Sequence, residues 1–337
     1  MARRLPITVD LAGTDADRAR TLGYARAADE AGVETIFVSE AWGREPFSQL
    51  ALLADRTERV TLGTSIVNVF SRTPAALAQH FATLDELSNG RAIIGLGTSG
   101  KLVIEEFHSV PFEKPATRLR ETIQIIKLLI AGEELRFQGQ VFQFDRGFTL
   151  RFTPFRKSIP VYLASFRPAG LRIVAEHGDG LLPMMIPLER LAEQVSNVRA
   201  MTAAAGRDPH AVVVKSPGVV IVTPDVAAAR QAYRQSLAFY VSRMGVYYYT
   251  QLTEMGRGEE VAAIRKAWDE GRSAGGAAAV SDDLLNAFAV VVTPDQLDDA
   301  VARLEAQSAA GVDLHQVTLT GIDDQAEQRR ILEHLVG

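Results

Sequence analysis

Short apolar runs alternate with longer amphipathic stretches along most of this sequence. Between the runs lie predicted helices with clear boundaries; one begins at Thr73-Pro74 and ends before Ser88-Asn89-Gly90. Alternating strands and helices predict a parallel sheet, and eight units favour a closed (β/α)8 barrel over an open doubly wound sheet. The eight runs that have the length and β-branched content of buried strands are residues 5–10, 35–39, 60–67, 91–97, 160–164, 179–184, 212–222 and 314–319.

Two segments interrupt this alternation. Residues 134–150 contain two short alternating runs around Gly139, which predict a hairpin inserted after the fourth helix. Residues 238–289 are too long for a plain connection, and we interpret their small-residue stretch at 271–277 as a loop. We expect this second insertion to act as a lid. No linker divides the chain, so we expect residues 1–337 to form a single (β/α)8 barrel domain.

Composition narrows the classes of function. The 337 residues are 47% hydrophobic, enough for a large core, and the net charge of -5 with no block of like charge argues against nucleic acid as a partner. No apolar run approaches the roughly 18 residues of a membrane span, and no signal peptide is evident, so we expect a cytoplasmic protein. The absence of cysteine excludes disulfides and thiol chemistry, so redox work requires a bound cofactor.

Histidines provide no metal motif. His80 and His177 fall in helical patterns and His108 falls in a loop, and none has a second histidine three or four residues away. We therefore expect no metal site, and interpret all six histidines as structural or solvated.

A glycine motif follows the fourth predicted strand. Gly95-Leu96-Gly97-Thr98-Ser99-Gly100 matches the G-x-G-x-x-G pattern that binds a dinucleotide pyrophosphate in a Rossmann unit. Here it follows the fourth strand rather than the first, and residues 101–111 do not have the pattern of a regular helix. We therefore favour a glycine-rich strand end that lets a ligand approach the backbone.

A family resemblance rests on residues 62–74, Leu-Gly-Thr-Ser-Ile-Val-Asn-Val-Phe-Ser-Arg-Thr-Pro. This string resembles the third-strand signature of the luciferase-like flavin and deazaflavin enzymes, especially the coenzyme F420-dependent methylenetetrahydromethanopterin reductases. The resemblance continues at residues 83–92, 114–115, 160–164, 178–180 and 294–295, and so spans most of the chain. It implies a luciferase-like barrel that binds coenzyme F420, and it implies a homodimer with contacts through the insertion and the second and third helices.

The resemblance also implies a set of cofactor contacts. In these enzymes a non-prolyl cis peptide bond forms a bulge behind the central cofactor ring, and here that bond is Ser65–Ile66. Phe166 and Arg167 occupy the turn that receives the cofactor phosphate in relatives, where two glycines are usual. Independently of the family, strand ends of a (β/α)8 barrel form one mouth. The expected cofactor-binding residues are Glu40, Ser65, Ile66, Asn68, Thr98, Ser99, Gly100, Ala164, Ser165, Phe166, Arg167 and Met184.

Departures from the family bear on the chemistry. Relatives that oxidise sugar phosphates or alcohols carry proton-transferring residues where this chain has Ala41 and Gly100. The reductases place a glutamate in the first strand where this chain has Thr8, with Asp10 on the same face two residues later. We take Glu40 and Asp10 as candidate catalytic residues. The expected substrate pocket includes Thr8, Trp42 and Phe70.

Our leading hypothesis is a coenzyme F420-dependent oxidoreductase that transfers a hydride between the deazaflavin and a small organic substrate. The missing proton carriers favour an electrophilic carbon, such as a methylene-pterin or folate-like iminium or an activated alkene. One alternative keeps the fold but binds FMN and acts as a luciferase-like monooxygenase. A second alternative is a non-catalytic flavin-binding or deazaflavin-binding relative.

Overall fold

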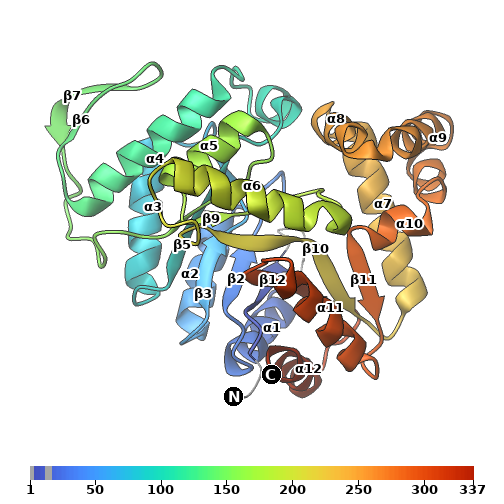
Figure 1. Cartoon of the computed structure of the whole chain (residues 1–337). Coiled ribbons are helices and arrows are strands. Elements are labelled where there is room, and N and C mark those ends of the chain that lie inside the picture. The colour runs from blue at the N-terminus through green and yellow to red at the C-terminus, as the bar shows by residue number, and fades with distance from the viewer. Residues whose placement is uncertain (1–3, 12–16) are drawn as a thin grey trace.

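The computed structural model describes residues 4–11 and 17–337. Its central feature is a closed barrel of parallel strands, in which each strand pairs with the next and the last returns to the first (Figure 1). The predicted (β/α)8 barrel is thus confirmed, and each of the eight predicted runs contains a barrel strand. In order around the barrel the strands are β1 (Ile7–Leu11), β2 (Thr35–Val38), β3 (Thr61–Thr64) with β4 (Val67–Asn68), β5 (Ala92–Gly97), β8 (Val161–Leu163), β9 (Gly180–Leu181), β10 (Val213–Val222) and β12 (Leu314–Leu319).

Helices cover the outside of the barrel (Figure 1). Several begin at a proline, whose fixed φ suits the first helical turn; the carboxylate of Glu45 and the hydroxyl of Thr73 then accept backbone N–H bonds at two of these starts. These caps fix the residue at which each of the two helices begins. The covering helices are α1 (Arg18–Glu30), α2 (Pro46–Arg56), α3 (Pro74–Leu87), α4 (Pro115–Ala131), α5 (Pro168–His177), α6 (Leu191–Ala204), α7 (Val226–Arg243), α11 (Leu297–Ala309) and α12 (Gln325–Val336).

Buried carboxylates hold the loops at the ends of these elements. Asp29 accepts hydrogen bonds from the backbone N–H groups of Glu58, Arg59 and Val60 just before β3. Burial alone would raise the pKa of Asp29, but these three donors outweigh it and lower the pKa. Glu121 on α4 accepts in the same way from three N–H groups of residues 140–142. That turn joins β6 (Leu135–Gln138) to β7 (Gln143–Phe148), which pair as an antiparallel hairpin.

A second insertion stands beside the barrel, at the right of Figure 1. After α7 it contains α8 (Tyr247–Leu252), the π-helical turn η3 (Thr253–Arg257), α9 (Gly258–Ala278), α10 (Asp282–Asn286) and β11 (Ala289–Val292). The expected loop at 271–277 is wrong, because these residues lie within α9, which is interrupted only at Arg272. At Gly276 the small size has a packing reason, because a Cβ there would lie 2.7 Å from the Trp268 ring.

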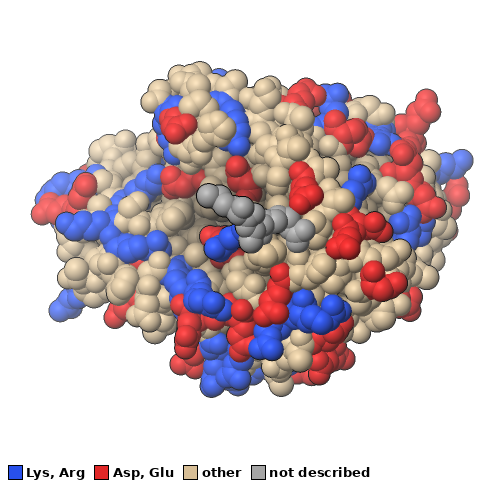
Figure 2. Space-filling model, turned by 60° about the horizontal axis from the view of Figure 1, so that its bottom comes forward, with Lys and Arg blue, Asp and Glu red and all other residues tan. Residues whose placement is uncertain are grey.

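Strand β11 was not predicted. It pairs with β10 along Val219 to Val222, beyond the point where β9 stops pairing. In the described part of the chain no helix combines the length and apolar character of a membrane span. Acidic and basic side chains are mixed over the face shown in Figure 2.

One buried histidine gives the fold a pH dependence. His315 on β12 is fully buried between Ser308, whose hydroxyl lies 2.7 Å from Nε2, and Gln307, whose Oε1 lies 3.1 Å from Nδ1. Burial lowers the pKa of His315 to about 4. The unfolded chain therefore binds a proton at this histidine more readily than the folded chain does. The free energy of unfolding is unaffected by this histidine above its unfolded pKa of about 6.5, and it decreases as the pH falls toward 4.

We therefore expect the His315→Gln variant to lose less stability on acidification than the wild-type chain. Between pH 7.5 and pH 5 the difference should be about 2 kcal/mol in the free energy of unfolding, measured by urea denaturation. Equal losses in both proteins would contradict this prediction.

Candidate active site

The carboxyl ends of the barrel strands bring the predicted residues to one mouth. Glu40 follows β2, the Ser65–Ile66 peptide joins β3 to β4 and is cis, and Met184 follows β9. Residues 98–100 follow β5, and residues 164–167 join β8 to α5. The segments that were predicted to form a cofactor site therefore share one end of the barrel.

A hydrogen-bonded network centres on Glu40, which is 9% exposed. Its Oε1 accepts from Arg72 Nη1 at 2.6 Å, and its Oε2 accepts from Asn68 Nδ2 at 3.2 Å. Asn68 Oδ1 accepts from the backbone N–H groups of Phe70 and Ser71 at 3.0 and 2.8 Å. The network ties the ends of β2 and β4 to the start of α3, so the side chains at this part of the mouth have fixed positions.

Glycines of the β5 end pack closely against the bulge between β3 and β4. A Cβ added to Gly95 would lie 1.5 Å from the Thr64 carbonyl oxygen, and one added to Gly97 would lie 2.9 Å from Ile66 Cδ1. A Cβ at Gly100 would meet nothing within 4 Å. The close approach of the Thr64 backbone requires glycine at position 95, Gly97 lies against the end of the Ile66 side chain, and Gly100 borders open space.

The turn before α5 is linked to the insertion. Arg167 is the N-cap residue of α5 and makes no side-chain cap, so the first backbone N–H groups of that helix lack this partner. Its guanidinium pairs with the carboxylate of Glu254 in η3 at 3.0 Å. The Phe166 ring lies 6.3 Å from the ring of Tyr248.

The insertion also contacts the end of β9. The Gln251 side-chain amide donates to the carbonyl oxygens of Met184 and Met185 at 3.2 and 3.1 Å. The Tyr248 hydroxyl lies 3.5 Å from Met184 Sδ, and burial raises the pKa of that hydroxyl. The segment 247–257 therefore packs over the mouth beside the turn at Arg167.

A charge pair lies inside the barrel. Lys215 Nζ donates to Asp10 Oδ2 at 2.7 Å and to Gln316 Oε1 at 3.0 Å, with the Phe37 ring 5.6 Å away. The Lys215 side chain is 5% exposed, whereas that of Asp10 is 23% exposed. Asp10 thus faces the mouth with its charge already balanced by a lysine that sequence reasoning missed. Lys215 could have been recognised from the sequence, because it is the single charged residue within the apolar run 212–222.

Two predicted pocket residues need correction. Thr8 is fully buried within the barrel, so it offers no surface to a ligand. Phe70 is 6% exposed and stacks on Phe112 at 5.0 Å, with the Arg118 guanidinium 4.8 Å from its ring. It therefore packs beneath α4 rather than lining the mouth. Trp42 is 48% exposed and lies near Phe239 of α7.

His108 contacts the Glu40 network. It ends the π-helical turn η1 (Val103–Phe107), and its Nε2 lies 3.4 Å from Asn68 Nδ2. His108 is therefore a structural partner of the Glu40 network, in agreement with the expectation of structural or solvated histidines. Spacing could not reveal this contact, because the two residues are 40 positions apart. In the described residues there is no cluster of potential metal ligands.

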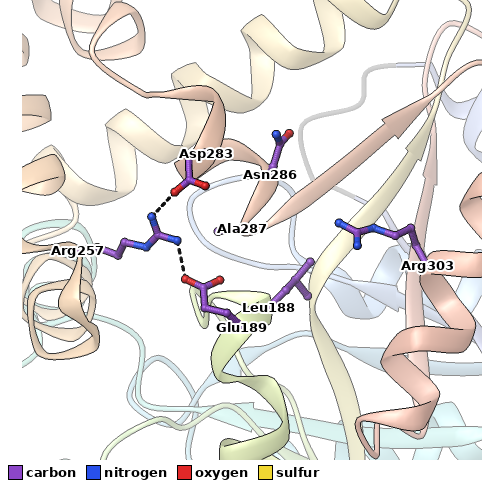
Figure 3. Close-up of a pocket in the computed structure, with 7 residues that line it drawn as sticks. All are labelled: Leu188, Glu189, Arg257, Asp283, Asn286, Ala287 and Arg303. Atoms are coloured by element: carbon purple, nitrogen blue, oxygen red, sulfur yellow. Dashed lines mark hydrogen bonds and ion pairs between the residues drawn. The ribbon is translucent and has the colours of Figure 1, made fainter.

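A separate pocket of about 350 Å³ lies outside this mouth, among η2 (Leu188–Arg190), the end of η3, α10 and α11 (Figure 3). Arg257 pairs there with Glu189 and Asp283, and Arg303 projects toward the same space (Figure 3). None of the predicted site residues lines it. The convergence of predicted residues therefore favours the barrel mouth as the functional site.

Comparisons with known proteins agree on one family. Residues 5–313 match the family model described as luciferase-like monooxygenase. The chain is 30% identical over 295 residues to the 5,10-methylenetetrahydromethanopterin reductase of Archaeoglobus fulgidus, covering 86% of each. It is 31% identical over 327 residues, 92% of each chain, to a Mycobacterium tuberculosis protein provisionally named a coenzyme F420-dependent oxidoreductase. The fold matches that of the coenzyme F420-dependent tetrahydromethanopterin reductase of Methanopyrus kandleri with a TM-score of 0.82, at 22% identity and over 99% and 98% of the two chains.

The Glu40–Arg72 pair should be important for stability. Its side chains are 9% and 18% exposed, and removing one partner of a buried pair leaves an uncompensated charge. We expect Arg72→Met to lower the free energy of unfolding by about 3 kcal/mol, measured by chemical denaturation. Adding Glu40→Gln to that variant should restore part of the loss.

The matched control is Arg56→Met, which breaks an exposed pair with Asp55. It should cost less than about 1 kcal/mol. Equal effects of the two arginine substitutions would show that the Glu40 pair has no special role.

Proposed function

We propose, from the premise that the chain belongs to the luciferase-like monooxygenase family, that it is a coenzyme F420-dependent oxidoreductase acting on a small organic substrate. The observation that carries the proposal is the similarity to F420-dependent enzymes over most of the chain, combined with the convergence of the expected cofactor-binding segments at one end of the barrel. The reaction would be hydride transfer between the deazaflavin and the substrate.

The residues of the mouth fit the cofactor ring. The bulge at Ser65–Ile66 lies under the small residues of the β5 end, and Ile66 and Ala164 are only partly buried. The ring would rest on this bulge between the ends of β5 and β8. Thr98, Ser99 and Ser165 would hydrogen-bond to its polar edge or to the ribityl chain.

The start of α5 fits the cofactor phosphate. Backbone N–H groups without a side-chain cap attract anions at a helix N-terminus, and the Arg167 guanidinium adds positive charge beside them. The Arg167–Glu254 pair is solvent exposed, with side chains 41% and 58% exposed. Such a pair contributes at most about 1 kcal/mol, so Arg167 can exchange its carboxylate partner for a phosphate.

The chain itself would bind, orient and shield the reactants. The bound cofactor supplies the hydride or accepts it. Glu40, Asn68 and Arg72 hold one side of the mouth rigid, Asp10 faces it with a balanced charge, and Trp42 provides an apolar wall. The insertion at 238–289 would act as a lid, supported by its contacts with Arg167 and Met184. The substrate would carry an electrophilic carbon, either an iminium or an activated alkene.

We also propose that the chain forms a homodimer through α2 and α3. An apolar groove between these helices is lined by Phe47, Ala51, Gln79, His80, Thr83, Leu84 and Leu87. Leu87 is 54% exposed and Leu52 on α2 is 39% exposed, and exposed apolar patches mark interfaces.

Leu87→Glu should therefore convert a dimer into a monomer in sedimentation velocity, because it places a charge in the contact. Phe148→Glu on the hairpin, where Phe148 is 70% exposed, is the control and should leave the dimer intact. A wild-type chain that sediments as a monomer at micromolar concentration would exclude this interface.

Cofactor choice is tested by fluorescence titration with F420 and with FMN. We expect saturable binding of F420 and weaker binding of FMN. Gly97→Val should weaken F420 binding, because its Cβ would lie 2.9 Å from Ile66 Cδ1 and would displace the Ile66 side chain from the bulge. Gly271→Val is the matched control, since a Cβ there meets nothing within 4 Å.

Tight binding of FMN with weak binding of F420 would support the monooxygenase alternative. Binding of neither cofactor would overturn the proposed function. Thermal melts of both glycine variants show whether a loss of binding reflects loss of the fold.

A further inference from the structure

The segment 247–257 of the insertion is joined to the start of α5 by weak contacts. Arg167 Nη1 donates to both carboxylate oxygens of Glu254 in η3, at 3.1 and 3.0 Å. Both side chains are solvent exposed, so water and salt screen their attraction. The neighbouring contact, between the rings of Phe166 and Tyr248, has a centroid distance of 6.3 Å. A competing anion can therefore replace the Glu254 carboxylate at a small cost in free energy.

The deeper contact of this segment, with the loop after β9, is strained. Gln251 is 2% exposed, and its Nε2 donates to the carbonyl oxygens of Met184 and Met185 at 3.2 and 3.1 Å. Its buried Oε1 has no hydrogen-bond partner among the described residues, which is unfavourable for a buried acceptor. Met185 has a φ of 57°, in the left-handed region that residues with a Cβ rarely adopt. The contact that holds the segment over the mouth is thus unfavourable in two respects.

A glycine separates the loosely held part of the segment from a firmly held part. Gly256 has a φ of 90° and a ψ of 8°, and it interrupts the helical path within the π-helical turn η3. Directly after it, Arg257 pairs with Glu189 and Asp283 on two other elements (Figure 3). Glu254 and Arg257 therefore lie on opposite sides of a residue that can act as a hinge.

We propose that the Arg167–Glu254 pair is a latch, which holds segment 247–257 over the mouth until the cofactor phosphate replaces the Glu254 carboxylate at Arg167. This inference rests on the proposed function, which places that phosphate at the start of α5. Glu254 and the phosphate compete for one guanidinium, and the loss of the pair frees the segment to turn about Gly256.

The latch has a consequence for affinity. A ligand binds less tightly when the chain must first leave a conformation in which the binding group is already occupied. Glu254 therefore weakens the binding of F420, although it lies beside the site and would add a contact if it were an ordinary part of it. A residue that only stabilised the fold or the site would have the opposite effect or none.

The first test is a fluorescence titration of F420 with the wild-type chain and with Glu254→Gln. The variant keeps the size of the side chain and removes its charge. We expect F420 to bind about 2- to 5-fold more tightly, which is the range that the loss of one exposed ion pair allows. The affinity for the same deazaflavin nucleoside without its phosphate should not change.

The matched control is Glu259→Gln, which removes an equal charge from an exposed residue in the first turn of α9. It should bind F420 as the wild type does. Thermal melts of both glutamine variants show whether the fold is retained.

The second test is hydrogen–deuterium exchange of the backbone amides of segment 247–257, measured by mass spectrometry. F420 should raise the exchange rate of this segment in the wild-type chain, because the latch is released, and the nucleoside without phosphate should leave the rate unchanged. Glu254→Gln should show the raised rate without any cofactor. The amides of β5 are the internal reference, and their exchange should not rise in any of these samples.

The outcomes separate the latch from the function on which it rests. A wild-type chain that binds no F420 overturns the proposed function. A chain that binds F420, but binds it no more tightly after Glu254→Gln, overturns the latch and leaves the cofactor assignment standing. An equal gain for the nucleoside without phosphate, or protection of segment 247–257 by F420, would also overturn the latch.

Discussion

The buried carboxylate of Glu40 joins segments that are far apart in the sequence, and the geometry of the mouth depends on it. A carboxylate that is 9% exposed is costly unless its charge is balanced, and Arg72 and Asn68 provide that balance. Through Arg72 it fixes the start of α3, and through Asn68 it fixes the turn after β4 and the ring of His108. One desolvated charge thus orders the side of the mouth next to the β3–β4 bulge.

Two further ion pairs lie at the mouth. Lys215 balances Asp10 inside the barrel, and Arg167 balances Glu254 on the insertion. The first pair is mostly buried and fixed, whereas the second is exposed and can exchange partners. A rigid interior and an adjustable rim suit a site that holds a planar ring firmly and admits an anionic tail at its edge.

The barrel could be predicted from the sequence because its strands are buried on both sides and are therefore continuous apolar runs. The glycines near the mouth were found from their pattern at the strand end, and the structure shows that Gly95 has no room for a side chain beside the Thr64 backbone. The remaining errors concern tertiary contacts. Phe70 was misplaced because its ring packs against Phe112 and Arg118, and β11 was not predicted because its apolar run is only four residues long. The contact of His108 with Asn68 was not predicted, because the two residues lie 40 positions apart and sequence spacing carries no signal for such a contact.

The central claim is that a deazaflavin binds at the carboxyl ends of the strands, with its ring against the bulge at Ser65–Ile66. The most direct measurement is a crystal structure of the chain soaked with F420. The account predicts density for the ring between that bulge and the end of β8, with the phosphate at the start of α5 beside Arg167. Density for F420 elsewhere, such as the pocket beside Arg257 and Arg303, with an empty barrel mouth, would contradict it.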